Sequence, residues 1–298
     1  MVIHGARYRP LDYQPTSRWR RGWPIAWNEF RSMFKMRWGM GIFLFILCFV
    51  PSLISLGWQF IYHGAYQIDS DVPWIEVVVG RTPRLNPASI SFYLDPILRE
   101  SFWVFMVLTT LVSCRAVAKD RPTDALEIYW TRGISPWGYF LAKWAGSFLL
   151  MGTVFIAAPL VVWLVGVAMA SDWTQLEDSL WFMPRVVVGL IFMTAVLTYA
   201  AVAFSAFSRT PNRSSLIWAF FILGTAAAGR VLSRVFRGEY SWKAIDPWDS
   251  SKRLVEWFAG VSPWEDYDPT AAFVCLGVTL ALLTIGLCRR LRHVEVIA

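Results

Sequence analysis

Long apolar runs recur along the chain and are separated by shorter polar segments. A helix needs about 20 apolar residues to cross the hydrocarbon core of a bilayer. Six runs approach or exceed that length, at about 40–62, 97–118, 139–170, 181–207, 214–233 and 271–291. The third is longer than one crossing requires, so we expect it to tilt or to begin in the cytoplasm. The pattern predicts an all-α integral membrane protein with six transmembrane helices, within a domain at 39–293.

The composition agrees with this pattern. The chain is 56% hydrophobic, only 16% of its residues are charged, and its mean hydropathy is +0.44. Soluble domains carry about 25% charged residues. A soluble enzyme or a soluble nucleic-acid-binding protein is therefore excluded, and the net charge of +7 indicates topology and contact with anionic lipids.

The distribution of Lys and Arg predicts the orientation, because short cytoplasmic segments are enriched in both. Basic residues dominate the first 38 residues, the segments at 115–143 and 208–213, and the C-terminal tail, whereas 171–180 has acidic residues and no Lys or Arg. We expect both termini in the cytoplasm of a bacterial cell, in its cytoplasmic membrane. The segment at 234–270 is also basic, but the number of spans assigns it to the outside, and long segments follow the rule poorly.

An amphipathic helix is expected before the first span. Residues 1–22 read as a basic arm, and residues 23–38 place Ala26, Phe30 and Phe34 on one face. Pro24 suits the first turn of a helix, and Trp23, Trp27 and Trp38 suit the membrane interface. We therefore predict a helix lying on the inner membrane surface. The alternative is an ordinary cytoplasmic extension of the first span.

The loop between the second and third predicted spans is unusually ordered for a connection. Pro122 suits the first turn of a short helix, which Gly133 would end. Ser135 then caps a new helix with Pro136 in its first turn. This predicts a helix, a turn and a second helix at the cytoplasmic surface, anchored there by aromatic residues at Trp137, Tyr139 and Trp144.

Sites for catalysis, nucleotides and metals are not recognisable in the sequence. There is no GxxxxGK[ST] motif to hold a nucleoside triphosphate. The histidines (His4, His63, His293) and cysteines (Cys48, Cys114, Cys275, Cys288) lack metal-ligand spacing. The spans carry no carboxylate at mid-depth, and Arg115 and Lys143 are expected to extend to the head groups. We predict no enzyme, no metal site and an external source of energy for any transport.

Two further features lie in the second half of the chain. Small residues on one face of the fifth span (Gly224, Ala227, Ala228) permit close helix packing, either within the chain or between two copies. The stretch "SSKRLVEWFAG" at 250–260 begins with a capping serine and predicts a short amphipathic helix at the outer surface.

The ordered loop resembles the signature of ABC-2-type transporter permeases. The matching residues are Asp120, Arg121, Asp124, Ala125, Leu126, Ile128, Tyr129, Arg132, Ile134, Ser135, Tyr139 and Lys143, with departures at Gly133 and Ala142. "AWNEFRSMFKMRW" resembles the elbow helix of that family, with Glu29 and Phe30 in place. Residues 200–220 resemble the end of the fourth span, and "VSPWEDY" at 261–267 resembles the Ser-Pro motif before the last one.

The resemblance implies an ABC-2, type V exporter-like fold with an elbow helix that includes Glu29, Phe30 and Phe34. It implies a permease driven by a separate ABC ATP-binding subunit, which would hold ATP and Mg²⁺, while this chain binds no cofactor. The partner would contact a coupling helix at 120–132 through Asp120, Arg121, Asp124, Leu126, Glu127, Tyr129, Trp130 and Arg132. A second permease copy or a paralogue would pack near Gly224, Ala227 and Ala228. The alternative is a non-transporting membrane anchor, through which an ABC ATPase works mechanically on an envelope partner.

Overall fold

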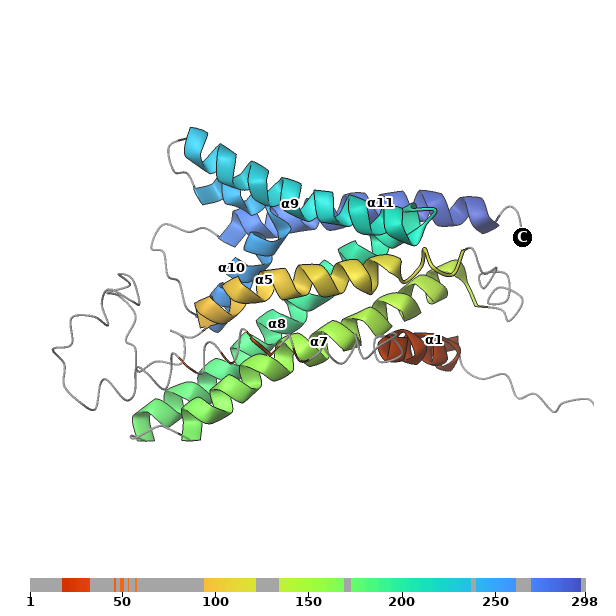
Figure 1. The fold of residues 1–298 in the computed structure, drawn as a ribbon. Coiled ribbons are helices and arrows are strands. Elements are labelled where there is room, and N and C mark those ends of the chain that lie inside the picture. The colour runs from red at the N-terminus through yellow and green to blue at the C-terminus, as the bar shows by residue number, and fades with distance from the viewer. Residues whose placement is uncertain are drawn as a thin grey trace, which may run out of the picture.

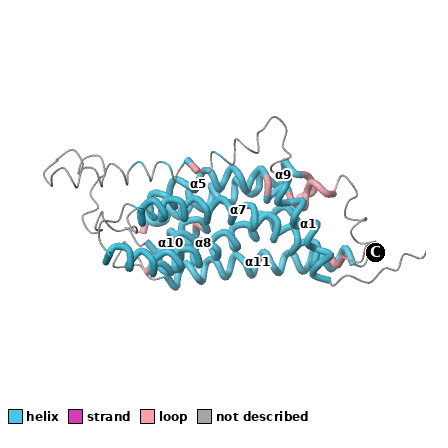
Figure 2. The backbone as a smooth tube through the Cα atoms, turned by 90° about the horizontal axis from the view of Figure 1, so that it is seen from below, coloured by secondary structure: helices cyan, strands magenta, loops and turns pink. Residues whose placement is uncertain are grey.

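The computed structural model describes residues 18–32, 94–121, 134–168, 173–236, 240–260 and 269–295, with the isolated residues 46, 49, 50, 53 and 57. Helices and short turns make up nearly all of these residues, and no strand occurs among them. The long helices run side by side along one direction (Figures 1 and 2). The expected all-helical membrane protein is therefore found over the described part of the chain.

Seven α-helices and two 3-10 helices make up this part of the chain. They are α1 (Arg18–Ser32), α5 (Leu94–Leu111), η3 (Ser113–Arg115), α7 (Pro136–Ala168), α8 (Trp173–Phe207), α9 (Pro211–Val235), η4 (Tyr240–Ile245), α10 (Pro247–Ala259) and α11 (Pro269–Glu295).

Four of these helices are long and apolar enough to cross a membrane. The qualifying stretches are Pro136–Val165 of α7, Leu180–Phe207 of α8, Pro211–Val235 of α9 and Pro269–Arg290 of α11. The apolar part of α5 and η3 is shorter, at Ser101–Arg115. The first expected span, at 40–62, lies outside the described residues except for the five isolated positions. The number of six spans and their boundaries therefore stay predictions.

The core forms where α5, α7 and α8 meet. Leu108 of α5, Leu150 and Met151 of α7, and Leu190 and Leu197 of α8 are each at most 1% exposed. The opposite faces of the outer helices remain apolar, with Phe220 of α9 75% exposed and Leu282 of α11 66% exposed. Exposed apolar side chains of this kind are expected on a helix bundle where lipid, rather than water, covers the surface.

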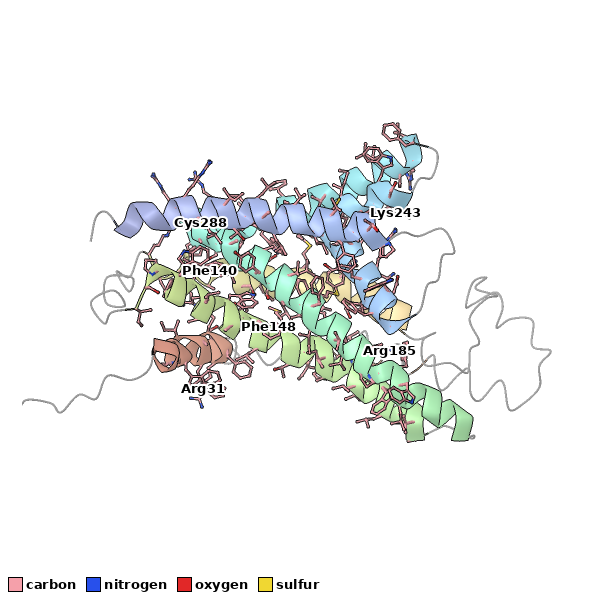
Figure 3. All side chains as sticks on the ribbon, turned by 180° about the vertical axis from the view of Figure 1, so that it is seen from behind. Arg31, Phe140, Phe148, Arg185, Lys243 and Cys288 are labelled. Carbon is pink, nitrogen blue, oxygen red and sulfur yellow. The ribbon has the colours of Figure 1, made fainter. Side chains whose placement is uncertain are left out.

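The two ends of the bundle are distinguished by the helices and residues that lie there. Arg31 on α1 and Cys288 on α11 lie at one end, and Arg185 and Lys243 lie at the other (Figure 3). α11 ends at the same end of the bundle as α1, and α10 lies in the opposite half (Figure 1). We call these the α1 end and the α10 end.

A helix is present in the first part of the stretch at 23–38 where an amphipathic helix was expected, but it begins earlier than predicted, and residues 33–38 lie outside the described residues. α1 starts at Arg18, so Arg18–Gly22, assigned to the basic arm, is helical and Pro24 lies inside the helix. A proline within a helix forfeits one backbone hydrogen bond, and packing of the buried Ile25 and Ala26 compensates for that loss. Trp23 and Trp27 are exposed, as expected of interfacial anchors.

The short helix of the 234–270 segment also differs from its prediction. α10 begins at Pro247, and Asp246 rather than a serine caps it by accepting a hydrogen bond from the Trp248 N–H at 3.0 Å. Ser250 is buried and donates to the carbonyl of Ala244 at 2.7 Å. The residue order Asp-Pro explains the earlier start, because proline in the first turn follows a capping aspartate.

α10 is packed inside the bundle rather than laid on its surface. Leu254 and Val255 are fully buried. Leu254 clusters with Ala272 and Leu276 of α11. At Gly189 in α8, an added Cβ would lie 2.9 Å from the Cα of Val255, so the two helices touch through backbone.

Candidate functional site

The segment that begins with the last residue of η3, residues 115–121, is fixed to the α1 end of α8. The hydroxyl of Ser205 accepts hydrogen bonds from the N–H groups of Val117 and Ala118, at 3.0 and 2.9 Å. The Arg121 guanidinium donates to the carbonyl of Ala206 at 2.6 Å. Two alanines in the segment are fully buried, and their small side chains permit this close seating. Residues 115–121, directly before the 122–133 region, are therefore held in place against α8.

A buried carboxylate on α1 joins the 115–121 segment to α1. Glu29 has no exposed surface. One of its oxygens accepts a hydrogen bond from the Lys119 ammonium at 2.8 Å, and the other accepts one from the Lys143 ammonium at 2.9 Å. Lys119 belongs to the 115–121 segment and Lys143 to α7, so a single side chain joins three parts of the chain.

Lys143 extends the set of contacts to a second carboxylate. Its ammonium lies 2.7 Å from an oxygen of Asp120, and the same oxygen accepts a hydrogen bond from the Tyr139 hydroxyl at 2.7 Å. The ammonium also lies 5.7 Å from the centre of the Tyr139 ring, within the range of a cation–π contact. We call Glu29, Lys119, Asp120, Tyr139 and Lys143 the Glu29 network.

The charges of the Glu29 network balance, with two ammonium groups and two carboxylates. Removing an ion from water costs several kcal/mol, and only close partners offset that cost. Lys143 is 2% exposed and touches both carboxylates, whereas the Lys119 side chain is 36% exposed. Lys143 is therefore the group whose charge depends most on the network.

Close packing of α1 on α7 brings Glu29 to Lys143. Gly146 lies one turn after Lys143, and a Cβ added there would lie 2.7 Å from the Cβ of Glu29 and clash with the carbonyl of Ala26. Only glycine permits this approach without a shift of α1. The pairing therefore depends on a residue that carries no charge itself.

Positive charge gathers where the 115–121 segment ends. Burial lowers the pKa of the Arg121 guanidinium from its ordinary value, and the positive charge of Arg290 on α11 lowers it further, with a smaller contribution from Arg209. Arg209 is exposed. The surface next to the start of the 122–133 region is thus basic, which favours an acidic partner surface.

A family model described as "ABC-2 family transporter protein" matches residues 23–293. The chain belongs to the ABC-2 transporter family. No curated protein matches it. Family membership agrees with the apolar helices of the structure. It identifies a membrane protein of the permease type that belongs to ABC transport. Permeases of this family associate with an ABC ATP-binding subunit and are typically not catalytic themselves.

Part of the expected coupling helix of this ABC-2 protein falls in the described region. Asp120 is nine-tenths buried in the Glu29 network, and Arg121 is bound to α8. The remaining residues expected at the ATPase contact lie outside the described residues: Asp124, Leu126, Glu127, Tyr129, Trp130 and Arg132. Of the residues expected in an elbow helix, Glu29 is buried, Phe30 is partly buried and packs against the core, and Phe34 lies outside the described residues.

Two of the small residues expected at a helix contact on α9, Gly224 and Ala227, are not covered by other described residues. A Cβ added at Gly224 would meet nothing within 4 Å, and Ala227 is exposed. Ala228 is half-buried. Whether Gly224 and Ala227 pack within the chain or against a second copy stays a prediction, since the expected first span lies almost wholly outside the described residues. The small residues of α9 that are buried are Ala226 and Gly229.

Two sequence-based interpretations at the α1 end are wrong. Lys143 was expected to extend to the head groups, but it is buried against two carboxylates. Tyr139 was expected to anchor α7 at the surface, but it is 4% exposed and holds Asp120. The expected cap is confirmed, because the Ser135 hydroxyl accepts a hydrogen bond from the Gly138 N–H at 3.1 Å and α7 begins at Pro136.

Proposed function

We propose that the protein is the permease subunit of an ABC exporter, and that it forms the transmembrane pathway in a bacterial cytoplasmic membrane with both termini inside. ATP and Mg²⁺ bind a separate ATP-binding subunit, which contacts the 120–132 segment from the cytoplasm. A second permease copy or a paralogue completes the pathway next to the uncovered face of α9 at Gly224 and Ala227. Family membership and the apolar helices support this proposal.

The observation that carries the mechanism is the Glu29 network. Lys119, directly before the 120–132 segment, is bound to α1 through Glu29, and Asp120, the first residue of that segment, is bound to α7 through Lys143. Separating buried ions from their partners is costly, so a displacement of the segment moves α1 and α7 with it. The ATP-binding subunit has to hold the segment differently with ATP and with ADP, because only differential contact shifts a conformational equilibrium.

Tyr139→Phe tests this role with little change of shape. The variant removes the hydroxyl that donates to Asp120 and leaves the ring in place. Tyr199→Phe is the matched control, because it removes a partly buried hydroxyl that bonds to Thr284 at 2.8 Å between α8 and α11 and is not a member of the network. Permease and ATP-binding subunit are purified together and placed in liposomes, and substrate flux and ATP hydrolysis are measured on the same sample.

We expect Tyr139→Phe to lower the flux per ATP hydrolysed, while Tyr199→Phe leaves that ratio unchanged. Equal ratios for both variants would remove the network from the coupling mechanism. Flux that requires only this protein and its ATPase supports a transporter. Hydrolysis that responds to an added envelope protein, without flux of any candidate cargo, would replace the transporter with a mechanical anchor.

A further inference from the structure

Ser205 of α8 holds two consecutive backbone groups of the chain that follows η3. Its hydroxyl oxygen accepts hydrogen bonds from the N–H groups of Val117 and Ala118, at 3.0 and 2.9 Å. On either side of this pair, the N–H groups of Ala116 and Lys119 donate to backbone carbonyls, at 3.2 and 3.0 Å. For Val117 and Ala118 the acceptor comes from α8 instead.

These two donors lie in the interior of the protein. Ser205 and Ala118 have no exposed surface, and Val117 is 6% exposed. Leaving a buried N–H group without an acceptor is costly, because the group has given up its hydrogen bond to water. Both N–H groups depend on a single oxygen atom, so the loss of that atom would leave both without their acceptor.

Two side-chain contacts to α8 flank this attachment. The Cys114 thiol donates to the carbonyl of Ala201 at 3.5 Å, and the Arg121 guanidinium donates to that of Ala206 at 2.6 Å. A thiol is a weak donor, and a long arginine side chain has many rotamers. Ser205 binds the backbone itself, so it fixes the path of the chain at this point.

α8 extends from this attachment to the opposite end of the bundle. Arg185 of the same helix lies at the α10 end (Figure 3), and Gly189 touches the backbone of Val255 in α10. Ser205 and Gly189 are separated by roughly 24 Å of helix. Of the four candidate spans α8 is the most buried, at 67% of its apolar stretch, against 22% for α9 and α11. A displacement of α8 would therefore act on the helices that surround it, α10 included.

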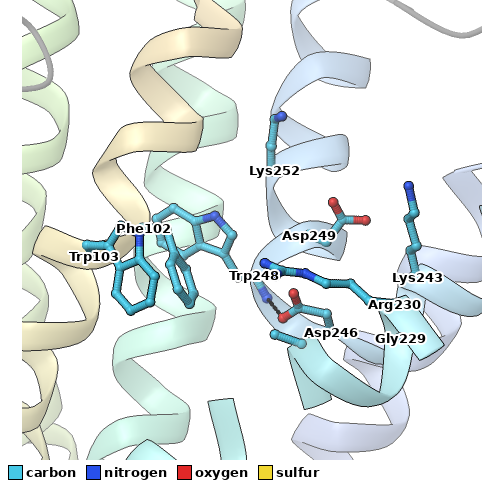
Figure 4. Close-up of a pocket in the computed structure, with 10 residues that line it drawn as sticks. Phe102, Trp103, Gly229, Arg230, Lys243, Asp246, Trp248, Asp249 and Lys252 are labelled. Atoms are coloured by element: carbon cyan, nitrogen blue, oxygen red, sulfur yellow. Dashed lines mark hydrogen bonds between the residues drawn. The ribbon is translucent and has the colours of Figure 1, made fainter. Parts of the chain in front are cut away.

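α10 borders a cavity of about 340 Å³ that α5, α9 and η4 also line (Figure 4). Trp248 of α10 packs edge to face against Phe102 of α5 in the wall of this cavity, with ring centres 5.3 Å apart. The Trp248 N–H is bonded to Asp246, which caps α10 (Figure 4). A displacement of α10 would therefore change the shape of the cavity.

We propose that Ser205 is a positioning residue of the permease. By holding two backbone N–H groups, it joins the start of the 120–132 segment to α8, so that a displacement of this segment by the ATP-binding subunit moves α8 and, through α8, α10. This inference rests on the proposed function. It adds α8 to the elements that the Glu29 network joins, α1 and α7, and the two attachments can be tested apart because they use different atoms.

Ser205→Ala removes the acceptor, and Ser208→Ala is its matched control. Ser208 lies three residues further along the chain and is 3% exposed, but its hydroxyl donates to the nearby carbonyl of Phe204, at 3.1 Å. Ser205→Thr and Ser205→Val form a second pair, because threonine and valine have the same shape and only threonine keeps the oxygen. The second pair separates the loss of the acceptor from any change in packing.

Hydrogen–deuterium exchange followed by mass spectrometry measures the attachment in complexes of the permease with its ATP-binding subunit, purified by size exclusion. We expect the amides of Val117 and Ala118 to exchange about tenfold faster in Ser205→Ala and Ser205→Val, since they lose their acceptor. Ser208→Ala keeps the slow exchange, and Ser205→Thr retains most of it. We expect ATP to change the exchange of α10 in the unchanged protein, and to change it less in Ser205→Ala. Equal exchange in the two alanine variants, or an α10 that does not respond to ATP in the unchanged protein, would overturn the inference.

Substrate flux and ATP hydrolysis, measured on the same liposomes, separate this inference from the proposed function. We expect the flux per ATP hydrolysed to fall in Ser205→Ala and Ser205→Val, to stay unchanged in Ser208→Ala and to be largely kept in Ser205→Thr. A smaller amount of folded complex lowers flux and hydrolysis together, so it leaves this ratio unchanged. An unchanged protein without ATP-dependent flux would refute the proposed function and this inference with it. Normal flux per ATP in all four variants would refute the role of Ser205 alone.

Discussion

Replacing Lys143 by methionine removes the charge that joins the two carboxylates of the Glu29 network. Methionine keeps the length and flexibility of the chain, so the change is mainly electrostatic. Removing one member of a buried ion pair costs about 3–5 kcal/mol, because the other member is left in the interior without compensation. Here Glu29 keeps Lys119 and Asp120 keeps the Tyr139 hydroxyl. We therefore expect a loss at the lower limit, about 3 kcal/mol.

Thermal unfolding of the purified protein in mild detergent, followed by tryptophan fluorescence, measures this loss as a lowered Tm. Lys119→Met is the control, because its ammonium contacts the same carboxylate but its side chain is 36% exposed. Partly exposed pairs contribute about 1 kcal/mol or less. A Lys143→Met protein that is no less stable than Lys119→Met would refute the reasoning.

The pairing itself is tested by adding Glu29→Gln to Lys143→Met. Each single change leaves an unbalanced charge in the network, whereas the double change leaves one ammonium on Lys119 and one carboxylate on Asp120. The combined loss is therefore expected to be smaller than the sum of the single losses. Strictly additive losses would show that Glu29 and Lys143 do not act on one another.

The remaining predictions concern packing, pH and coupling. Gly146→Ala forces α1 away from α7 and is expected to cost about 1–3 kcal/mol in the same unfolding assay, whereas Gly224→Ala, where an added Cβ meets nothing within 4 Å, is expected to be neutral or stabilising. Burial raises the pKa of Asp246 from 3.8 to about 6 in the folded protein, so folding favours its protonated form. The contribution of Asp246 to stability is therefore greatest below pH 3.8 and is lost as the pH rises through about 6. Asp246→Asn retains a capping oxygen and is expected to remove this contribution to the pH dependence of Tm. Glu127→Lys is expected to abolish stimulation of the partner ATPase without lowering Tm; stimulation at the level of the unchanged protein would argue against contact at 120–132.

The placement of Asp120 changes which residues test the proposed coupling role of the 120–132 segment. From the sequence, charge reversal at Asp120, charge reversal at Glu127 and disruption of Leu126 are equivalent ways to uncouple the ATPase. In the structure Asp120 is nine-tenths buried and holds Lys143, so its reversal would destabilise the junction of α1 and α7 as well. Glu127 and Leu126 are therefore the informative positions.

Short sequence motifs predicted the start of a helix correctly where the interaction that fixes the start lies within the motif itself. Ser135 and Pro136 mark the start of α7 because a cap acts within one turn. Pro24 predicted the wrong start for α1, because the preference of proline for the first turn is weaker than the packing of Ile25 and Ala26 on α7. At α10, the pair Asp246 and Pro247 was the stronger local signal.

The Glu29 network could not be predicted from local sequence patterns, because its members are far apart in sequence and come together only in the folded protein. Glu29 and Lys143 are 114 residues apart in sequence. Two hints were nevertheless present. Glu29 lies three residues after Ala26, on the apolar face of its own helix, and Lys143 is the single charged residue of the 33-residue α7. A lone cation in an apolar helix either extends to the membrane surface or finds a buried carboxylate, and only the rotation of α7 against α1 decides which.

The unequal exposure of the two lysines suggests an order of events when the 120–132 segment moves. Lys119 can reach water as it leaves Glu29, so that contact is the less costly one to break. Lys143 is sealed between Glu29 and Asp120, and its two contacts resist separation. A force applied through residues 120–132 would therefore open the Lys119 contact first and carry Asp120, Lys143 and α7 together. An apolar junction of the same size would permit sliding, whereas this one fixes the three elements at defined atoms.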